Sequence, residues 1–576
     1  MNPKQILKKY YGYDHFRKGQ EEIIASLLKK RDTIAIMPTG SGKSLCFQIP
    51  ALLFNGKSIV ISPLISLMKD QVDNLKSMGI EATYINSSLP ADEIRERTNA
   101  FVYGHCKILY IAPERLNTAC FLEGVSSVEI EQVAVDEAHC VSQWGHDFRP
   151  SYQLIKDFVG NLSGDPVLSA FTATATQAVR LDIKRLLGLE NPEVFDLGLK
   201  RSNIYIEVVK GKNKRQFLEE IIKKRTGESG IVYCSTRKTV DELYHFLERK
   251  DIKIGRYHAG MEPEHRKEMQ DKFILEDVEI MIATNAFGMG IDKPNIRYIL
   301  HYNMPKTLES YYQEIGRAGR DGEPAQAYLL YSDVDKRIQR FIIDRSDLNE
   351  TRLSIANSKL QDMVNFCHTH ECLWKAISLY FGEIEENDCQ NCRNCLDENL
   401  IEKDITVEAQ KILSCVYRMS QSYGASTIAK VLKGSKSSKV KLKGFERLST
   451  YGIMKELTEK EIRELINFLS AEGYLEVSNG VYPIIKLTKK SWDVLKGFQK
   501  VVKKTTFIKV RRKENNQLYQ ALKELRKTIA LEENVPPYIV FHDYSIREMS
   551  NINPSTVEEL IEIKGVGEKK LKKYGE

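Results

Sequence analysis

Across residues 33–331, short apolar runs rich in β-branched residues alternate with longer stretches of mixed polarity. The apolar runs are DTIAIM (32–37), SIVIS (58–62), KILYIA (107–112), EQVAVD (131–136), GIVYCS (230–235) and EIMIAT (279–284). Strands that are apolar on both faces are typical of parallel sheets covered by helices, and their alternation with helices predicts βαβ units. A second series begins near Arg201, so we expect two α/β domains, over residues 1–200 and 201–340.

Beyond residue 332 the pattern becomes helical, and residues 406–490 predict helices followed by a β-hairpin. The hairpin signal is YLEVSNGVYPIIKL, in which Asn479 and Gly480 separate two apolar runs, because Asn-Gly favours a tight primed turn. Helices followed by a hairpin are typical of a winged-helix domain. We therefore expect three further units, which are a helical cysteine-containing module over 341–402, a winged-helix domain over 403–505 and a small helical domain over 514–576.

The composition excludes several classes of protein. The 576 residues are 42% hydrophobic and 28% charged, which suffices for several buried cores. No apolar run is long enough for a membrane span, and the N-terminus lacks the apolar core of a secretion signal. We expect a cytoplasmic monomer with no membrane partner, associated with the nucleoid if the source is bacterial.

The formal net charge is +7, and much of the basic excess lies in the C-terminal half. Residues 426–444 contain lysines and no acid, and residues 481–513 are rich in lysine and arginine with Asp493 as their one acid. Such clusters beside a winged-helix pattern indicate contact with a nucleic-acid backbone. The alternatives are a solvated lysine face for the first segment and a linker for the second.

A phosphate-binding loop is predicted at MPTGSGKS (37–44), between the first strand and a helical stretch. Gly40 and Gly42 let the backbone turn its N–H groups toward phosphates. Lys43 is expected to reach the β- and γ-phosphates of ATP, and Ser44 to bind Mg²⁺.

Two acids follow another buried strand, in VAVDEAH (133–139). Asp136, at the carboxyl end of the strand, is placed to hold Mg²⁺ through water, and Glu137 is the candidate general base for the attacking water. A solvated acidic turn would be the alternative if the phosphate loop were absent.

A third segment, QEIGRAGRDG (313–322), contains Arg317 and Arg320, which would share one face of a helix. An arginine that reaches across a domain cleft stabilises charge on the γ-phosphate, so hydrolysis would need closure of the cleft. Gln20, with Tyr13 and Arg17, precedes the phosphate loop; its amide can pair with adenine, and Tyr13 can stack on the ring.

Directly after the acids, SQWGHDFRP (142–150) carries a cluster of aromatic and basic residues, namely Trp144, His146, Phe148 and Arg149. Aromatic stacking on a base contributes about 1–3 kcal/mol irrespective of base sequence, so this loop is a candidate DNA sensor. A packed aromatic turn is the alternative.

The cysteines fall into two groups. Four of them are clustered and predict a closed tetrahedral Zn²⁺ site with a structural role, with an iron–sulfur cluster as the alternative: Cys372, Cys389, Cys392 and Cys395. The others are scattered, as expected of buried thiols in a reducing compartment.

These stretches, in this order, resemble the superfamily 2 helicases, with SAFTATAT (169–176) and ATNAFGMGIDKPN (283–295) as further motifs. Three features narrow the resemblance to the RecQ family: the loop CVSQWGHDFRP (140–150), the cysteine set and the order of the later segments. The resemblance covers nearly the whole chain. It implies two RecA-like parallel-sheet domains, a zinc-binding module, a winged helix and an HRDC-like segment. That segment is short for such a domain, as though its last helix were missing.

The resemblance further implies an ATP-dependent DNA helicase that moves 3′ to 5′ on single-stranded DNA and unwinds duplex DNA in repair and recombination. Its catalytic positions correspond to Lys43, Ser44, Asp136, Glu137, Gln313, Arg317 and Arg320. Its nucleotide-contacting positions correspond to Tyr13, Arg17, Gln20, Thr39, Gly40, Ser41, Gly42, Lys43 and Ser44. The four clustered cysteines would hold zinc.

Two other hypotheses stay open at this point. An RNA helicase is one, because the DEAH sequence also marks RNA enzymes, although the cysteine module and winged helix argue against it. A non-enzymatic nucleic-acid-binding scaffold is the other, and the intact lysine, acids and arginines argue against that.

Overall fold

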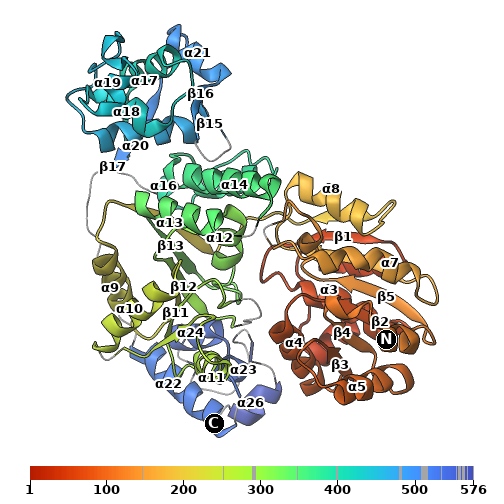
Figure 1. Ribbon diagram of the computed structural model, residues 1–576. Coiled ribbons are helices and arrows are strands. Elements are labelled where there is room, and N and C mark those ends of the chain that lie inside the picture. Colours follow the sequence, from red (N-terminus) through yellow and green to blue (C-terminus); the bar gives the residue numbers. More distant parts are fainter. Residues whose placement is uncertain are drawn as a thin grey trace.

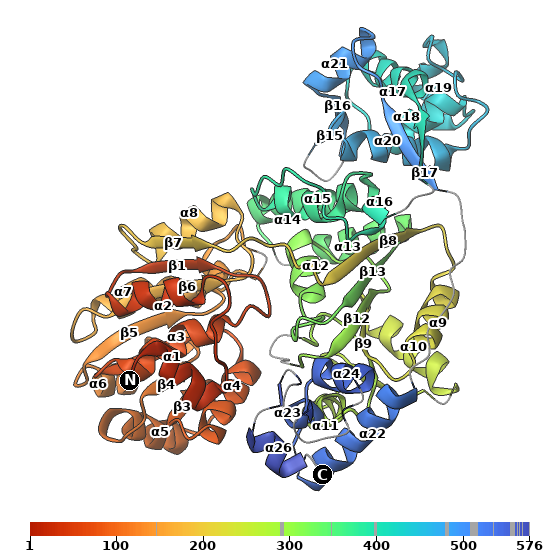
Figure 2. The ribbon, with the colours of Figure 1, turned by 180° about the vertical axis from the view of Figure 1, so that it is seen from behind.

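The computed structural model describes residues 1–145, 147–250, 252–288, 293–346, 348–396, 400–478, 483–506, 517–533, 535–552, 554, 559–560, 563, 565–566 and 568–574. Two α/β lobes lie side by side, with the later domains stacked along the second lobe (Figures 1 and 2). No helix in these described ranges is long and apolar enough to cross a membrane.

The first lobe, residues 3–196, is a seven-stranded parallel sheet in the order β3-β4-β2-β5-β6-β1-β7. Alternate residues of its strands enter two apolar clusters, so that Ile34 and Ile36 pack on one face and Ala35 and Met37 on the other. The strands are β1 (Thr33–Ile36), β2 (Lys57–Ile61), β3 (Ala82–Ile85), β4 (Ile108–Ile111), β5 (Ile130–Val135), β6 (Val167–Thr172) and β7 (Glu193–Asp196). The helices are α1 (Pro3–Ile6), α2 (Gln20–Leu28), α3 (Lys43–Leu53), α4 (Ile65–Ser77), α5 (Ala91–Tyr103), α6 (Ala119–Val125), α7 (Ile155–Gly160) and α8 (Gln177–Leu186).

The second lobe, residues 204–344, is a six-stranded parallel sheet in the order β10-β11-β9-β12-β13-β8. Its strands are β8 (Ile204–Lys210), β9 (Ser229–Tyr233), β10 (Ile254–Tyr257), β11 (Ile280–Ala283), β12 (Ile296–His301) and β13 (Ala325–Tyr331). Its helices are α9 (Lys214–Lys224), α10 (Arg237–Glu248), α11 (Pro263–Ile274), α12 (Leu308–Ile315) and α13 (Asp333–Asp344). The predicted pair of parallel-sheet units is confirmed, and residues 197–203 connect them.

The cysteine module shares its core with the second lobe, because Cys372, Cys392 and Trp374 belong to one apolar cluster with Tyr312 and Ile206. The Trp374 indole N–H donates to the carbonyl of Ile204, 3.1 Å away. The helices of the module are α14 (Glu350–His368), α15 (Leu373–Tyr380) and α16 (Arg393–Leu396).

The winged-helix domain has its own core and is closed by an antiparallel pair, β14 (Leu400–Asp404) with β17 (Val502–Thr506). Its helices are α17 (Thr406–Arg418), α18 (Ala425–Lys433), α19 (Ser438–Leu442), α20 (Glu459–Ala471) and α21 (Lys489–Leu495). The predicted hairpin forms between β15 (Leu475–Val477) and β16 (Ile485–Leu487), and its tip lies outside the described residues. The linker alternative for 481–513 is wrong for residues 485–506, which form β16, α21 and β17.

The last domain contains α22 (Gln517–Glu532), α23 (Pro537–Val540), α24 (Asp543–Ile552) and α26 (Glu568–Tyr574). It lies at the foot of the second lobe beside α11 (Figure 1). Arg526 of α22 reaches the second lobe, with its guanidinium 3.3 Å from the Glu276 carboxylate.

Candidate ATP site, loop contacts and metal centre

The phosphate loop joins β1 to the first turn of α3, as predicted. Gly40 and Gly42 have φ values of 77° and 82°, in the left-handed region that favours glycine. A Cβ atom at Gly42 would lie 2.5 Å from the Gln20 amide nitrogen, so a side chain there would also displace the Gln20 amide from the loop. Lys43 and Ser44 begin α3, where free backbone N–H groups favour an anion.

The two acids follow β5, and the structure brings Glu137 close to the phosphate-loop lysine. Lys43 Nζ lies 3.7 Å from Glu137 Oε1. Glu137 has a left-handed φ of 47°, a strained geometry that costs roughly 1–3 kcal/mol and turns its side chain toward the loop. Burial and the adjacent Glu137 carboxylate raise the pKa of Asp136 to about 6, an effect that a bound divalent cation would oppose.

His139 connects these acids to the SAFTATAT segment, a role that the sequence analysis did not assign. Its Nδ1 lies 3.3 Å from Glu137 Oε2 and 3.0 Å from the hydroxyl of Thr172 at the end of β6. The Thr172 hydroxyl in turn donates to the carbonyl of Thr174. The only available signal was the place of His139 in DEAH.

The expectation that Arg317 and Arg320 share a helix face is wrong. Helix α12 ends at Ile315, and both arginines lie in the turns that follow, where Gly319 adopts a left-handed φ of 56°. The Arg317 guanidinium donates to the Gly288 carbonyl within its own lobe. Gln313 lies on α12 itself, two residues before its end.

The GRAGRDG segment (316–322) of the second lobe nevertheless touches the phosphate loop of the first. A Cβ atom at Gly316 would lie 1.8 Å from Thr39 Oγ1, and one at Gly40 would lie 3.0 Å from Arg320 Cγ. The two segments therefore meet across the crevice, as the prediction of a shared site requires.

Arg201 also lies in this crevice, although the sequence analysis used it only as a domain boundary. Its guanidinium donates to the carbonyl of Thr39 in the first lobe and, over 2.7 Å, to that of Gly319 in the second. Its sequence signal was its place on the connection between two α/β units.

The upstream segment is bonded to the phosphate loop. The Gln20 amide donates to the carbonyls of Ser41 and Gly42, at 3.0 and 3.1 Å, and accepts from the Arg17 backbone N–H. The Arg17 guanidinium donates to the Gly40 carbonyl, while Tyr13 is 47% exposed. Adenine contact by Tyr13, Arg17 and Gln20 stays a prediction, and Gln20 would have to exchange its present partners.

The aromatic loop faces α14 of the cysteine module instead of the sheet. Trp144 is 47% exposed, and its carbonyl accepts from Lys359 Nζ over 2.6 Å. The Arg352 guanidinium lies 4.3 Å from the centre of the Phe148 ring. Arg149 donates to the Pro63 carbonyl in the first lobe, and His146 lies outside the described residues.

A cavity of about 630 Å³ lies between this loop and α14. Trp144 and Thr176 line it from the first lobe, and Ser358, Lys359 and Asp362 line it from α14. The Lys359 ammonium also lies 2.5 Å from Glu309 of α12, so one side chain touches the loop and the helix that leads to GRAGRDG.

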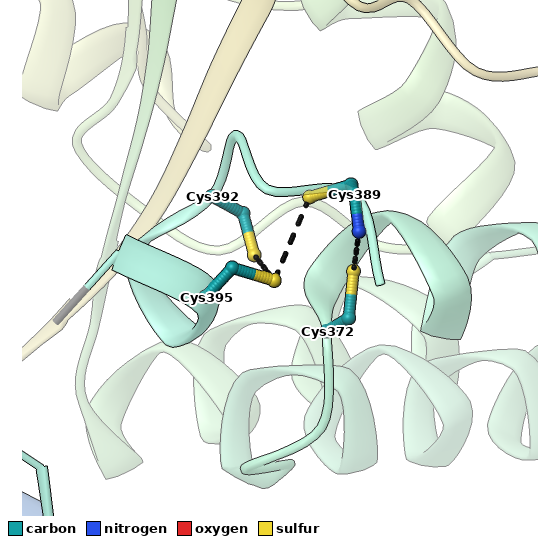
Figure 3. Close-up of side chains that lie close together, drawn as sticks. All are labelled: Cys372, Cys389, Cys392 and Cys395. Carbon is teal, nitrogen blue, oxygen red and sulfur yellow. Dashed lines mark hydrogen bonds between the residues drawn. The ribbon is translucent and has the colours of Figure 1, made fainter. Parts of the chain in front are cut away.

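The four clustered cysteines converge on one point (Figure 3). Their sulfur atoms all lie within 4.8 Å of one another, with Cys392 to Cys395 at 3.5 Å and Cys389 to Cys395 at 3.8 Å. Tetrahedral zinc with bonds of ~2.3 Å places sulfurs ~3.8 Å apart, so the set fits this ion. Backbone N–H groups of Leu373 and Asn391 donate to the sulfurs of Cys392 and Cys389, at 3.4 and 3.3 Å.

Models of known families match successive parts of the chain. They are DEAD/DEAH box helicase (17–181), helicase conserved C-terminal domain (213–322), RecQ zinc-binding (332–396), RQC domain (400–512) and HRDC domain (515–576). With the two lobes and their facing segments, these matches define an ATP-dependent helicase that carries a zinc-binding module.

Relatives narrow the class. The ATP-dependent DNA helicase RecQ of Bacillus subtilis is 46% identical over 99% of this chain and 97% of its own length. The protein of the same name from Pasteurella multocida is 38% identical over 99% and 92%. This chain belongs to the RecQ family of ATP-dependent DNA helicases.

A solved structure of Mss116p bound to ssRNA and AMP-PNP is 17% identical, covers 68% of this chain and 89% of its own, and has a TM-score of 0.51. At that identity the likeness shows the fold alone. Because the chain belongs to a family of DNA helicases, the DNA-helicase hypothesis is preferred over an RNA helicase and over a non-enzymatic scaffold.

Proposed function

We propose that ATP is hydrolysed in the crevice between the two lobes. Lys43 and the backbone of residues 39–44 bind the phosphates, Glu137 accepts a proton from the attacking water, and Arg320 with Arg317 and Gln313 senses the γ-phosphate. The observation that supports this most directly is the meeting of Gly316 with Thr39, which brings the GRAGRDG segment onto the phosphate loop.

Ser44 and Asp136 would hold Mg²⁺, which supplies positive charge beside the phosphates when bound. The buried Asp136, with its raised pKa beside Glu137, is an anionic site that gains from such a cation. His139 keeps Glu137 near the Thr172 hydroxyl and so couples the general base to the end of β6.

Each ATP cycle would close and open the crevice and so shift the two lobes along one DNA strand. Trp144, His146, Phe148 and Arg149 would report the bound strand to the adjacent acids. The support is that Trp144 and Phe148 contact α14 through Lys359 and Arg352, next to a cavity between the first lobe and the cysteine module.

We further propose movement in the 3′ to 5′ direction and a role in repair and recombination, in the cytoplasm, by a monomer. The proposed domains are 1–200, 201–340, 341–402, 403–505 and 514–576. The lysines of 426–444 and 481–513 would contact the duplex backbone, in a manner that weakens with salt.

A strand-displacement assay tests this proposal. Duplexes with a single-stranded 3′ or 5′ tail are mixed with the parent or with Lys43→Ala, with and without ATP. We expect ATP-dependent displacement on the 3′-tailed duplex by the parent, and loss of ATPase and displacement in Lys43→Ala with DNA binding retained. Turnover at the parental rate in Lys43→Ala would refute the site, and displacement only from the 5′ tail would refute the polarity.

A further inference from the structure

Arg201 lies on the connection between the lobes, between β7 and β8. Its guanidinium binds oxygen atoms from both sides of the crevice. The partners are the carbonyls of Thr39, Gly316 at 3.3 Å, Ala318 at 3.2 Å and Gly319 at 2.7 Å, and the Asn203 side-chain oxygen at 3.2 Å. The planar guanidinium of one residue thus hydrogen-bonds to both the phosphate loop and the GRAGRDG segment.

All of these partners within the described chain are neutral oxygens, although the guanidinium carries a full charge. Asp321, an acid whose charge favours the charged form of Arg201, is itself paired with Arg297 at 2.5 Å. Burial is the main cause that lowers the pKa of Arg201 to about 10, and Arg320 and Arg17 act in the same direction.

Three arginines therefore meet residues 39–40 of the phosphate loop, two through their guanidinium groups and Arg320 through its aliphatic stem, and the charges of Arg17 and Arg320 both act on Arg201. Arg17 donates to the Gly40 carbonyl, Arg320 lies against Gly40, and Arg201 donates to the Thr39 carbonyl. Bringing like charges together in a partly buried crevice costs free energy unless negative charge is supplied. A bound triphosphate would supply it, and loss of phosphate would restore the repulsion.

We propose that Arg201 is a positioning residue that couples closure of the two lobes to occupancy of the phosphate pocket. The proposal rests on the nucleotide site proposed above. Arg201 touches the backbone on both sides, so it acts on the reaction by setting the distance between GRAGRDG and the phosphate loop. Because Arg201 lies on the segment that connects the two lobes, its contacts with both lobes are made at the point about which the lobes would move.

A purely structural role in shaping the GRAGRDG turn is the competing explanation, and a neighbouring residue separates the two. The Asn203 amide donates to the carbonyls of Gly319 and Glu323, at 2.8 and 2.9 Å, which both belong to the second lobe. Asn203 thus braces the same turn without reaching the first lobe. Asn203→Ala removes this brace and one bond of Arg201 within the second lobe but leaves the Arg201 bond to Thr39, so it is the matched control.

The experiment compares the full-length parent, Arg201→Ala, Arg201→Lys and Asn203→Ala. Steady-state ATPase gives kcat and KM, a fluorescent ATP analogue gives Kd, and small-angle X-ray scattering with a non-hydrolysable ATP analogue reports closure. Melting temperatures identify any variant that fails to fold. Lys43→Ala is assayed in parallel as the test of the pocket itself.

For Arg201→Ala we expect kcat to fall on the order of tenfold to a hundredfold, because a misplaced catalytic segment has effects of that size. The Kd should change much less, and the analogue should no longer reduce the radius of gyration as in the parent. Arg201→Lys keeps the charge but lacks the planar guanidinium, so it should recover part of kcat. Asn203→Ala should retain closure.

A parental kcat and parental closure in Arg201→Ala would overturn the proposal, as would an equal loss in Asn203→Ala. If Arg201→Ala did not fold, Arg201→Lys would decide alone, and full activity with full closure in that variant would count against the role of the planar guanidinium. Turnover in Lys43→Ala would instead show that the pocket assignment is wrong, whatever Arg201 does.

Discussion

At the scale of single residues, the crevice depends on groups whose partners lie far away in the sequence. Lys43 and Glu137 were predictable because each belongs to a short motif next to a strand. Arg201 and His139 were not, because their partners, Thr39 with Gly319 and Thr172, are brought to them only by the fold. The spacing of residues within a short motif does not indicate contacts with residues far away in the sequence.

Gly316 gives the sharpest prediction at this scale. Its φ of −63° suits any residue, but a Cβ atom would lie 1.8 Å from Thr39 Oγ1. Gly316→Ala should therefore fold normally and fail to bring the GRAGRDG segment onto the phosphate loop. We expect ATPase kcat to fall by about tenfold or more, because displacing a group that stabilises the transition state lowers the rate by at least that factor.

The matched control is Gly160→Ala, which adds the same methyl group where no atom lies within 4 Å. ATPase rates and melting temperatures are measured for both variants. If Gly316→Ala kept the parental rate, the contact between the two segments would be irrelevant to hydrolysis.

At the scale of elements, the sequence predicted the strands well and the end of α12 poorly. Buried parallel strands require continuous β-branched runs, and those are visible in the sequence. The spacing of Arg317 and Arg320 alone predicted that both lie on one helix. In the structure α12 ends at Ile315, and glycines shape the turns that contain the two arginines. The pairing of the aromatic loop with α14 was also invisible, since it joins residues about 200 positions apart, such as Trp144 and Lys359.

This pairing predicts how the loop acts. Trp144→Ala removes a half-exposed ring but leaves its carbonyl bond to Lys359 possible. We expect DNA-stimulated ATPase to fall at least about fivefold, since base stacking contributes ~1–3 kcal/mol, while basal turnover is unchanged. Tyr103→Ala, at an 81% exposed position on α5, is the control. An equal loss of basal and stimulated rates would show that the ring is merely structural.

At the scale of the whole molecule, the last domain is held on the second lobe by charges that are almost fully buried. Glu276 accepts from Lys293 at 3.3 Å and from Asn295 at 2.7 Å, and Arg526 of α22 lies 3.3 Å from the same carboxylate. Asp543 of α24 joins Arg526, at 2.8 Å, to the Asn295 amide. The sequence predicted this helical domain but gave no sign of its docking, because Glu276, Arg526 and Asp543 lie outside the motifs and are brought together only by the fold.

Burial raises the pKa of Glu276, but the charges of Lys293, Arg526 and Lys523 together outweigh the effect of burial and lower this pKa to about 2. A depressed carboxyl pKa contributes stability that is present above the ordinary value of 4.5 and is lost as pH falls toward 2. Docking through Glu276 should therefore be constant across the neutral range of pH.

Glu276→Gln tests the docking, since it keeps the shape of the side chain but removes the buried counter-charge of Lys293 and leaves Arg526 with Asp543 alone. Removing one partner of a buried pair costs about 3–5 kcal/mol, and the retained amide should reduce this to ~2 kcal/mol. We expect hydrogen exchange in α22 and α24 to accelerate accordingly. Asp277→Asn is the control, because its pair with Lys527 crosses the same boundary at 2.9 Å but is partly exposed and should contribute under about 1 kcal/mol. Equal exchange in the two variants would mean that apolar contacts, and not the buried charges, hold the last domain in place.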